Sequence, residues 1–564
     1  MIWKEKLYRE DQFNLLKGQG VAELFCSLIA NRNFEHIKKK SDIKTLIDSP
    51  FDLIEPPEAL ENIELAMREC ITAGGHDVVV FGDYDVDGIV SSYMFEKLMR
   101  ELHASSVDVY LPSRTSDGYG LNDRSVENFI KICKKPYALV AILDCGSSSR
   151  KHIEKIRAHL PDARCIVIDH HIIEPENFSS NADAVVNPRM NDATPYCTGG
   201  LVFQLARKCG EEAIINVPKY MPYAALTTIA DVCELTGTNR VIVKNGLRQL
   251  NSCTDVGLST LFKVADVSTI DCNSEDIAFR IAPMINASGR MTVASDAYKV
   301  FMSEDIEQAK VSAKHLKSLN EDRKKIQKEA AVEAISIFDA DQAGKSSALL
   351  YKENWNPSIV GIVASKISET YNVPTICFGN YDGKIKGSAR SIEGVNIKEI
   401  MDSCSEIFIA HGGHEMAAGA ELDPAFIDTA WEIFDKKVKE YLEAHNIGEP
   451  SISYDCELSP DLMLRVNDVF CERLAMLEPY GPGNPTPIFR ANGLQCNRVK
   501  EWGSGTGAFV HFDNTGLNSV AYGKGIKKRL HGKTVDVLFS INRSFLDEED
   551  WHMRIIDFKQ DNKQ

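Results

Sequence analysis

The chain has 564 residues, and at about 100–200 residues per domain this length predicts three to four domains. Its hydrophobic fraction of 44% is typical of a folded globular protein. The formal net charge of -17 argues against a protein whose whole surface is coated by nucleic acid, but it is compatible with a local basic channel.

The 15 cysteines include no C-x-x-C pair, so neither a zinc ribbon nor a thioredoxin-type site is supported. The N-terminus, MIWKEKLYREDQF, lacks the apolar core of a signal peptide. No apolar run approaches the roughly 18 residues of a membrane span. We therefore expect reduced thiols, a cytoplasmic location and no contact with a membrane.

The first part of the chain divides into a short segment and an α/β domain. Residues 1–40 are mixed and charged, and we expect a peripheral segment. Residues 41–240 alternate strand-like runs with amphipathic stretches, the rhythm of a parallel sheet with crossover helices. The clearest strand-like runs are VVVF (78–81), YALVAIL (137–143), RCIVI (164–168) and AVVN (184–187).

The rest of the chain predicts a connector, a second lobe and a β domain. Residues 241–340 are a helical region that ends in a connector, because 303–338 contain no Gly or Pro and are rich in helix-forming residues. A helix of that length would span roughly 50 Å. Residues 341–445 return to α/β character, and 446–564 carry short alternating runs separated by Gly and Asn turns, which predict a small barrel or sandwich.

The stretch FGDYDVDGIV resembles the first half of a calcium-binding EF-hand loop. An EF-hand requires a bidentate Glu at its twelfth position, which is Met94 here, and a helix before the loop. The preceding residues, HDVVVF, instead predict a buried strand. The strand would deliver carboxylates to its C-terminal end, where open α/β sheets bind ligands. An ordinary Asp-rich turn is the alternative.

Each predicted strand of the first domain is followed by potential ligands for a hard metal ion. They are Asp83, Asp85, Asp87, Asp144, Asp169, His170, His171 and, after a later apolar stretch, Asp231. Parallel strands bring these positions to one edge, where buried carboxylates require a counter-charge. Two Mg²⁺ or Mn²⁺ ions about 4 Å apart, bridged by Asp144, would supply it and promote in-line attack of a hydroxide on a phosphodiester. A helix cap or a satisfied histidine pair is the alternative for DHH alone.

Four segments resemble the motifs of the DHH phosphoesterase family: DYDVDG, LDCGSS, VIDHH and TTIADV. Others, among them LPSRTSDGYGLN, IAPMINASGRM, GIVASKISETYNVP, GSARS, GGHEMAAG and LEPYGPGNPTPIF, resemble segments of the RecJ family over residues 45–560. The resemblance implies a DHH domain and a DHH-associated domain, two α/β lobes joined by the long helix, and a C-terminal OB-fold β-barrel. It also implies hydrolysis of single-stranded DNA from the 5′ end.

The resemblance assigns roles residue by residue. The implied metal ligands are Asp85, Asp87, Asp144, His170 and Asp231, with Asp83 as a further ligand or a nearby hydrogen-bond acceptor. His171 would face the scissile phosphate as a donor or acid, and Asp144 and Asp169 complete the implied catalytic set. The implied substrate-binding residues are Arg114, Arg290, Ser388, Arg390, Gly412, Gly413 and His414. For any single Arg, a solvated surface position is the alternative.

Two residues depart from the family pattern. Met284 stands where the family usually has Arg, and Asn356 where it usually has His. Both changes remove a potential phosphate or base contact, while all the implied metal ligands are present. We therefore expect the activity to be retained, while the substrate affinity or the preferred substrate length can differ from that of a typical family member.

The C-terminal region carries residues suited to a single strand. Its candidate stacking side chains are Trp502, Phe509, Phe512, Tyr522 and Phe545, although aromatics in a barrel are more often core residues. A basic cluster comprises Lys524, Lys527, Lys528, Arg529 and Lys533. Local positive charge in an acidic protein suits a phosphate backbone.

Two other function classes stay open at this point. One is a DHH phosphodiesterase of short oligonucleotides or cyclic dinucleotides, and the other is a non-catalytic scaffold that binds single strands. By the resemblance, a single-strand-binding protein and a helicase are expected partners. The sequence does not decide whether the substrate is DNA or RNA, whether the metal is Mn²⁺ or Mg²⁺, or what the oligomeric state is.

Overall fold

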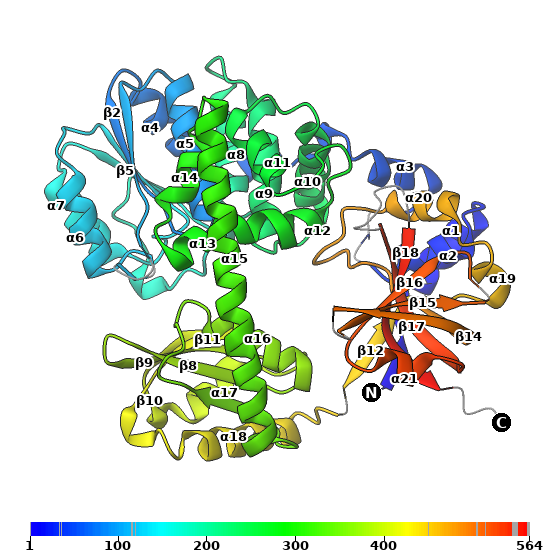
Figure 1. The fold of residues 1–564 in the computed structure, drawn as a ribbon. Coiled ribbons are helices and arrows are strands. Elements are labelled where there is room, and N and C mark those ends of the chain that lie inside the picture. The colour runs from blue at the N-terminus through cyan, green and yellow to red at the C-terminus, as the bar shows by residue number, and fades with distance from the viewer. Residues whose placement is uncertain are drawn as a thin grey trace.

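The computed structural model describes residues 2–32, 34, 37–113, 117–118, 120–448, 450–503, 506–513, 515–543 and 551–560. Figure 1 shows an α/β lobe above a second lobe, with one long helix running through both and a β-barrel to the side. Within the described part of the chain, no helix is both long enough and apolar enough to cross a bilayer.

The first lobe is built on a parallel sheet of five strands in the order β3-β2-β4-β5-β6. The strands are β2 (Asp77–Phe81), β3 (Ser106–Tyr110), β4 (Leu139–Leu143), β5 (Arg164–Ile168) and β6 (Ala184–Val186). Four of them coincide with the runs that the sequence predicts. The edge strand β3 is only half-buried along its length, so its sequence carries a weaker apolar signal.

Helices cover both faces of this sheet because successive strand residues point to opposite sides. In β2, Val78 and Val80 join one apolar cluster, whereas Val79 and Phe81 join another with Phe129. The helices of the lobe include α4 (Ile63–Thr72), α5 (Val86–Glu101), α6 (Asp123–Ile132), α7 (Arg150–His159), α8 (Thr198–Cys209) and α9 (Met221–Ala230). The chain continues through α10 (Gly237–Leu250), α11 (Val256–Val264), α12 (Ser274–Asp276), η6 (Ile277–Ile281), α13 (Ala282–Met291) and α14 (Ser295–Phe301).

The long connector is confirmed as α15 (Ile306–Ile337), a helix of 32 residues. At 1.5 Å per residue it is about 48 Å long. Its first half packs on α11, α13 and α14 of the first lobe, and its second half packs on α16 (Val360–Tyr371) of the second. A single continuous helix therefore sets the separation of the two lobes (Figure 1).

The second lobe has a mixed five-stranded sheet in the order β10-β11-β9-β8-β7. Its strands are β7 (Ala348–Tyr351), β8 (Thr375–Tyr381), β9 (Lys384–Arg390), β10 (Phe408–Gly413) and β11 (Ala417–Leu422). Besides α16, the helices α17 (Ile397–Ser403) and α18 (Ala430–Ala444) pack in this lobe. The glycine-rich segment forms the β10–β11 hairpin, so it lies on one edge of the sheet.

The C-terminal region closes into a barrel, because β14 (Phe489–Trp502) pairs with both β15 (Gly507–Phe512) and β17 (Thr534–Arg543). The other barrel strands are β16 (Asn518–Tyr522) and β18 (Trp551–Gln560). Helix α21 (Ile526–Leu530) joins β16 to β17. The predicted OB-type barrel is therefore confirmed by its closed strand pairing.

The N-terminal segment 1–40, expected at the periphery, packs into the core of the barrel domain. Strand β1 (Ile2–Glu5) pairs in parallel with β12 (Ser451–Tyr454). Helices α1 (Glu10–Gly18), α2 (Glu23–Ala30) and α3 (Lys40–Asp48) add apolar side chains to the same cluster as the barrel strands. Arg32 donates to Asp455 at 2.9 Å, and both side chains are almost fully buried. A buried pair of this kind depends on both partners, so the two ends of the chain form one unit.

Candidate metal centre and substrate cleft

The strand order places a ligand site between β2 and β4. Strand β3 lies on one side of β2 and β4 on the other, so the chain changes direction across the sheet at this point. The loops that leave such neighbouring strands diverge and open a crevice at their carboxyl ends. The acidic motif follows β2 and Asp144 follows β4, so the topology itself brings these carboxylates together.

The acidic motif is a turn that becomes the start of α5. Asp85 caps this helix and accepts a hydrogen bond from the Gly88 amide at 3.1 Å. A Cβ on Gly88 would lie 2.6 Å from the backbone of Asp83, so the glycine is needed for the helix to pass against the loop. The close approach leaves Asp83 and Asp87 each only 2% exposed. The glycine that suggests an EF-hand therefore has a packing role here.

Asp87 and Asp144 are both held by the N-terminus of α8. The amides of Thr198 and Gly199 donate to the Asp87 carboxylate at 2.7 and 2.8 Å. These donors belong to the positive end of a helix dipole, which favours a carboxylate. The Thr198 hydroxyl donates to Asp144 at 3.0 Å, and Asp144 has a left-handed backbone with φ of 63°.

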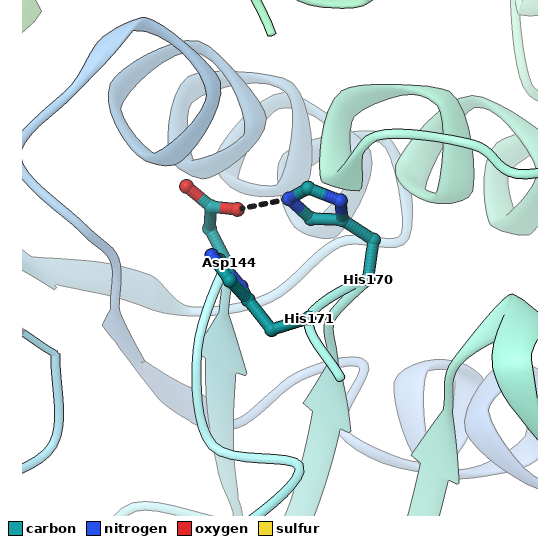
Figure 2. Close-up of side chains that lie close together, drawn as sticks. All are labelled: Asp144, His170 and His171. Atoms are coloured by element: carbon teal, nitrogen blue, oxygen red, sulfur yellow. Dashed lines mark ion pairs between the residues drawn. The ribbon is translucent and has the colours of Figure 1, made fainter. Parts of the chain in front are cut away.

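His170 lies among three of these carboxylates. Its Nε2 is 3.3 Å from Asp144 and 3.9 Å from Asp87, and its Nδ1 is 3.6 Å from Asp231. Figure 2 shows the His170 ring directed at the Asp144 carboxylate, with His171 on the adjacent turn. Asp231, at the end of α9, completes this side of the site.

Potential metal-ligand atoms converge in three overlapping groups, which we call the metal-binding cluster. The groups are Asp83, Asp85 and Asp144; Asp87, His170 and Asp231; and Asp144, His170 and His171. Within each group the ligand atoms lie within 4.8 Å of one another. Asp144 and His170 each belong to two groups, and of the two only the Asp144 carboxylate offers two oxygens, as expected of a bridging ligand.

The electrostatics of the cluster match a divalent cation. Burial and the neighbouring carboxylates Asp87 and Asp85 raise the pKa of Asp144 well above its usual value. Burial and Asp87 raise the pKa of Asp231 to about 7. Carboxylates packed this closely favour a positive counter-charge, and a set of oxygen donors with one imidazole suits Mn²⁺ or Mg²⁺.

Asp169 is not a member of the three ligand groups, and its side chain holds the DHH turn. One of its oxygens accepts from the backbone amides of His170 and His171 and lies 2.8 Å from His171 Nδ1. Burial opposes ionisation of Asp169, but the bond and charge of His171 outweigh it and keep its pKa below the usual value. Burial alone would lower the pKa of His171, yet the bond to Asp169 raises it to about 9. Asp169 therefore orients His171.

A cavity of about 800 Å³ lies between the two lobes beside the cluster. Tyr84 from the acidic loop lines one side, and Ser388 and Arg390 of β9 line the other. Arg390 donates to the Ser388 hydroxyl at 2.7 Å. Gly412 and Gly413 of β10 also line the cavity.

The remaining candidate residues lie in other settings. Arg290 donates to the Ser358 carbonyl at 2.7 Å and so links the first lobe to the second. His414 is exposed in the β10–β11 turn, while His411, which sequence reasoning did not select, lines the cavity. Arg114 lies outside the described residues.

The two departures from the family pattern differ in their surroundings. Met284 is 3% exposed within the apolar core of the first lobe. Asn356 caps the turn before α16, where its side chain accepts from the Ser358 amide at 2.8 Å. Neither residue is among the ligand groups of the metal-binding cluster.

The barrel exposes part of the predicted aromatic set. Trp502 and Phe509 are in ring contact at 4.4 Å, and the Tyr522 ring lies 6.1 Å from Trp502. Phe509 and Tyr522 are exposed, and Arg554 lies over the Tyr522 ring. Phe512 is fully buried, so its assignment as a stacking residue is wrong. Residues along β15 alternate between buried and exposed, and Phe512 is on the buried side. Phe545 lies outside the described residues.

Replacing Thr198 by valine is expected to lower activity about tenfold at a limiting metal concentration. The change preserves shape but removes the hydroxyl that orients Asp144, and such partners of metal ligands typically contribute 10–100-fold in metal affinity or activity. The measurement is the activity as a function of Mn²⁺ concentration. Thr198→Ser retains the hydroxyl and is the matched control, so equal losses in both variants would refute the orienting role.

Family models match three parts of the chain. The DHH family N-terminal domain matches residues 77–231, the DHHA1 domain matches 344–440 and the RecJ OB domain matches 454–557. The three matches lie within the first lobe, the second lobe and the barrel, respectively.

Curated relatives are similar over most of the chain. A single-stranded-DNA-specific exonuclease RecJ from Bacillus subtilis is 29% identical over 93% of this chain and 66% of its own length. The chain thus matches just under two thirds of that relative. RecJ proteins from Dickeya dadantii and Thermus thermophilus are each 30% identical, over 74% and 86% of this chain and 75% and 68% of their own lengths.

Solved structures agree with this assignment. A RecJ from Thermus thermophilus in complex with Mn²⁺ superposes with a TM-score of 0.80 at 24% identity, over 99% of this chain and 79% of the other. An exonuclease RecJ bound to manganese superposes with a TM-score of 0.58 at 26% identity, over 70% of this chain and 96% of the other. The shared domains, the extent of the sequence similarity and the common fold lead to one conclusion: this chain belongs to the RecJ family.

Proposed function

We propose that this protein hydrolyses single-stranded DNA from its 5′ end to nucleotides and depends on Mn²⁺ or Mg²⁺. The observation that carries the proposal is the convergence of five aspartates and His170 at the sheet edge, beside a cavity lined by both lobes. The curated relatives are named single-stranded-DNA-specific exonucleases, and Thermus thermophilus RecJ structures contain Mn²⁺ or Mg²⁺.

The metal-binding cluster offers enough donors for two ions. One group of donors is Asp83, Asp85 and Asp144, and the other is Asp87, His170 and Asp231. When bound, divalent cations supply Lewis acidity to a phosphodiester and lower the pKa of water. Thr198 and the α8 amides keep Asp144 and Asp87 in place, so the donors are preorganised.

His171 is suited to bind the substrate directly. Its Nδ1–H bond to Asp169 fixes the ring, which directs the chemistry to Nε2. The raised pKa of His171 favours the protonated ring, which can donate to a phosphate oxygen or a leaving oxygen. Asp169 is then a positioning residue for His171.

The cleft and the barrel would select a single strand together. Arg390, Ser388 and the β10 glycines line the cavity, where a guanidinium and open backbone amides can hold phosphates. On the barrel, Trp502, Phe509 and Tyr522 offer stacking faces. Stacking and phosphate contacts tolerate any base, so we expect little sequence preference.

We assign a separate role to each of three parts of the chain. We assign hydrolysis to residues 41–240, phosphate binding to 341–445 and strand capture to 446–564. A cytoplasmic location is supported by the free thiols of the cysteines. A single-strand-binding protein and a helicase are proposed partners by family resemblance.

The experiment that tests the proposal uses a long single strand labelled at its 3′ end, its blunt duplex and a pentanucleotide, each with Mn²⁺. We expect a ladder that shortens from the 5′ end of the single strand while the duplex stays intact. Cleavage of the pentanucleotide alone would assign the protein to short oligonucleotides. Binding without any cleavage would support a scaffold and contradict the proposal.

A further inference from the structure

One large aromatic side chain on the first lobe is exposed to solvent rather than buried in the core. Phe279 is 72% exposed, although aromatic rings in folded proteins are mostly buried. It belongs to η6, a π-helical turn, and π-helical turns are frequent at functional sites. Its neighbours Ile277 and Ile281 are 1% and 0% exposed, so the turn is anchored by packing while Phe279 points outward.

Phe279 shares a helical face with residues that contact the active site. Helix α13 continues directly from η6, and Pro283, Asn286 and Arg290 follow Phe279 at the spacing of one helical face. The residues between them, such as Met284 and Ile285, are buried in the core of the lobe. The outward face of η6 and α13 therefore runs from Phe279 to Arg290.

The far end of this face touches the acidic loop and the second lobe. Asn286 accepts a hydrogen bond from the Val86 amide at 3.1 Å. A Cβ on Gly289 would lie 2.6 Å from the Tyr84 carbonyl oxygen, so α13 packs directly on the loop that carries the aspartates. Arg290 donates to the carbonyl of Ser358, a residue that lines the cavity.

The near end of the same face touches the barrel domain. In α12, the Ser274 hydroxyl donates to the Tyr480 carbonyl, and Glu275 accepts from Asn542 at 3.4 Å. Figure 1 shows α12 and α13 along the lower side of the first lobe, with α12 toward the barrel. Phe279 thus lies between the barrel contact and the acidic loop, about 10 Å along the helix axis from Asn286.

We propose that Phe279 stacks on a base of the substrate strand between the barrel and the metal-binding cluster. The proposal rests on the proposed function and adds a substrate-binding residue to it. A single strand held by the barrel and cut at the cluster has to cross this interval, and an exposed ring can stack on any base. Phe279 then favours strands long enough to reach it, and a dinucleotide at the cluster gains nothing from it.

The test compares Phe279→Ala and Phe279→Leu with a matched surface control, Ile214→Ala, whose side chain is 99% exposed. Loss of one stacked base is expected to raise KM for a long single strand about fivefold or more, with kcat unchanged. Phe279→Leu is expected to follow Phe279→Ala because it lacks a π face. Cleavage of a dinucleotide should be the same in all four proteins.

A strand with one abasic position gives a second readout. Moved nucleotide by nucleotide from the 5′ end, the abasic site is expected to raise the wild-type KM at one position, and Phe279→Ala should be insensitive there. An unchanged KM in Phe279→Ala would overturn the proposal. So would an equal loss on the dinucleotide, which would indicate a structural role.

Binding without divalent ions separates this inference from the proposed function. The probe is a single strand carrying 2-aminopurine at the position found by the abasic scan. Quenching of its fluorescence by the wild type, absent in Phe279→Ala, supports stacking. Equal quenching by both proteins overturns the inference alone, whereas a wild type that binds no strand overturns the proposed function and the inference with it.

Discussion

Replacing Asp144 by asparagine is expected to lower kcat on single-stranded DNA by at least about a thousandfold, because the residue belongs to two ligand groups of the cluster. Asparagine suits this position, since Asp144 has a left-handed backbone that Asn tolerates and Ala does not. The variant therefore removes charge without adding strain. The measurement is kcat at saturating Mn²⁺.

Strand binding and folding are the controls for this variant. The cavity and the barrel are unchanged, so the affinity for a single strand is expected to stay within a few-fold of the wild type. Asp123, an exposed acid on α6, provides the matched control as Asp123→Asn. Activity of Asp144→Asn within tenfold of the wild type would contradict the assignment of the metal-binding cluster.

Removal of divalent ions is expected to abolish cleavage, and addition of Mn²⁺ is expected to restore it. The same ions should stabilise the first lobe, because burial and neighbouring carboxylates already disfavour the charged forms of Asp87, Asp144 and Asp231. Binding at a hundred times Kd contributes about 2.7 kcal/mol, which corresponds to a rise of about 5 °C or more in Tm. The measurement is thermal unfolding with chelator and with Mn²⁺.

The Asp144→Asn variant serves as the internal comparison for the thermal experiment. With chelator it is expected to unfold at a higher temperature than the wild type, because one of several mutually repelling carboxylates is gone. With Mn²⁺ it should gain less stability than the wild type. An equal gain in both proteins would mean that the ions act elsewhere on the molecule.

Local patterns in the chain were sufficient for most of the elements. The run at 164–168 is β5 without any shift, and the Gly- and Pro-free stretch at 303–338 is α15 within a few residues at each end. Both signals are short-range, since an apolar β-branched run and a long helix-forming run need no distant partner to be recognised. The acidic motif was harder, because α5 begins inside it and places Asp87 in a helical turn.

The sequence predicted those residues of the site that come directly after a strand. Asp144 and His170 come at the ends of β4 and β5, and parallel strands place such residues on one edge. Thr198 carries no comparable signal, because its hydroxyl reaches Asp144 only after α8 has packed on the sheet. His411 in the cavity and the buried position of Phe512 are likewise outcomes of how strands pair.

By itself, the sequence determined the α/β character of both lobes, the connector helix and the set of residues suited to a divalent cation. These properties depend on periodicity and on residue chemistry, which are local. Only the tertiary structure decided that the N-terminal helices share a core with the barrel and that Phe279 lies between the barrel and Asn286. Such contacts join residues far apart in the chain, and their free energy comes from surfaces that exist only after folding.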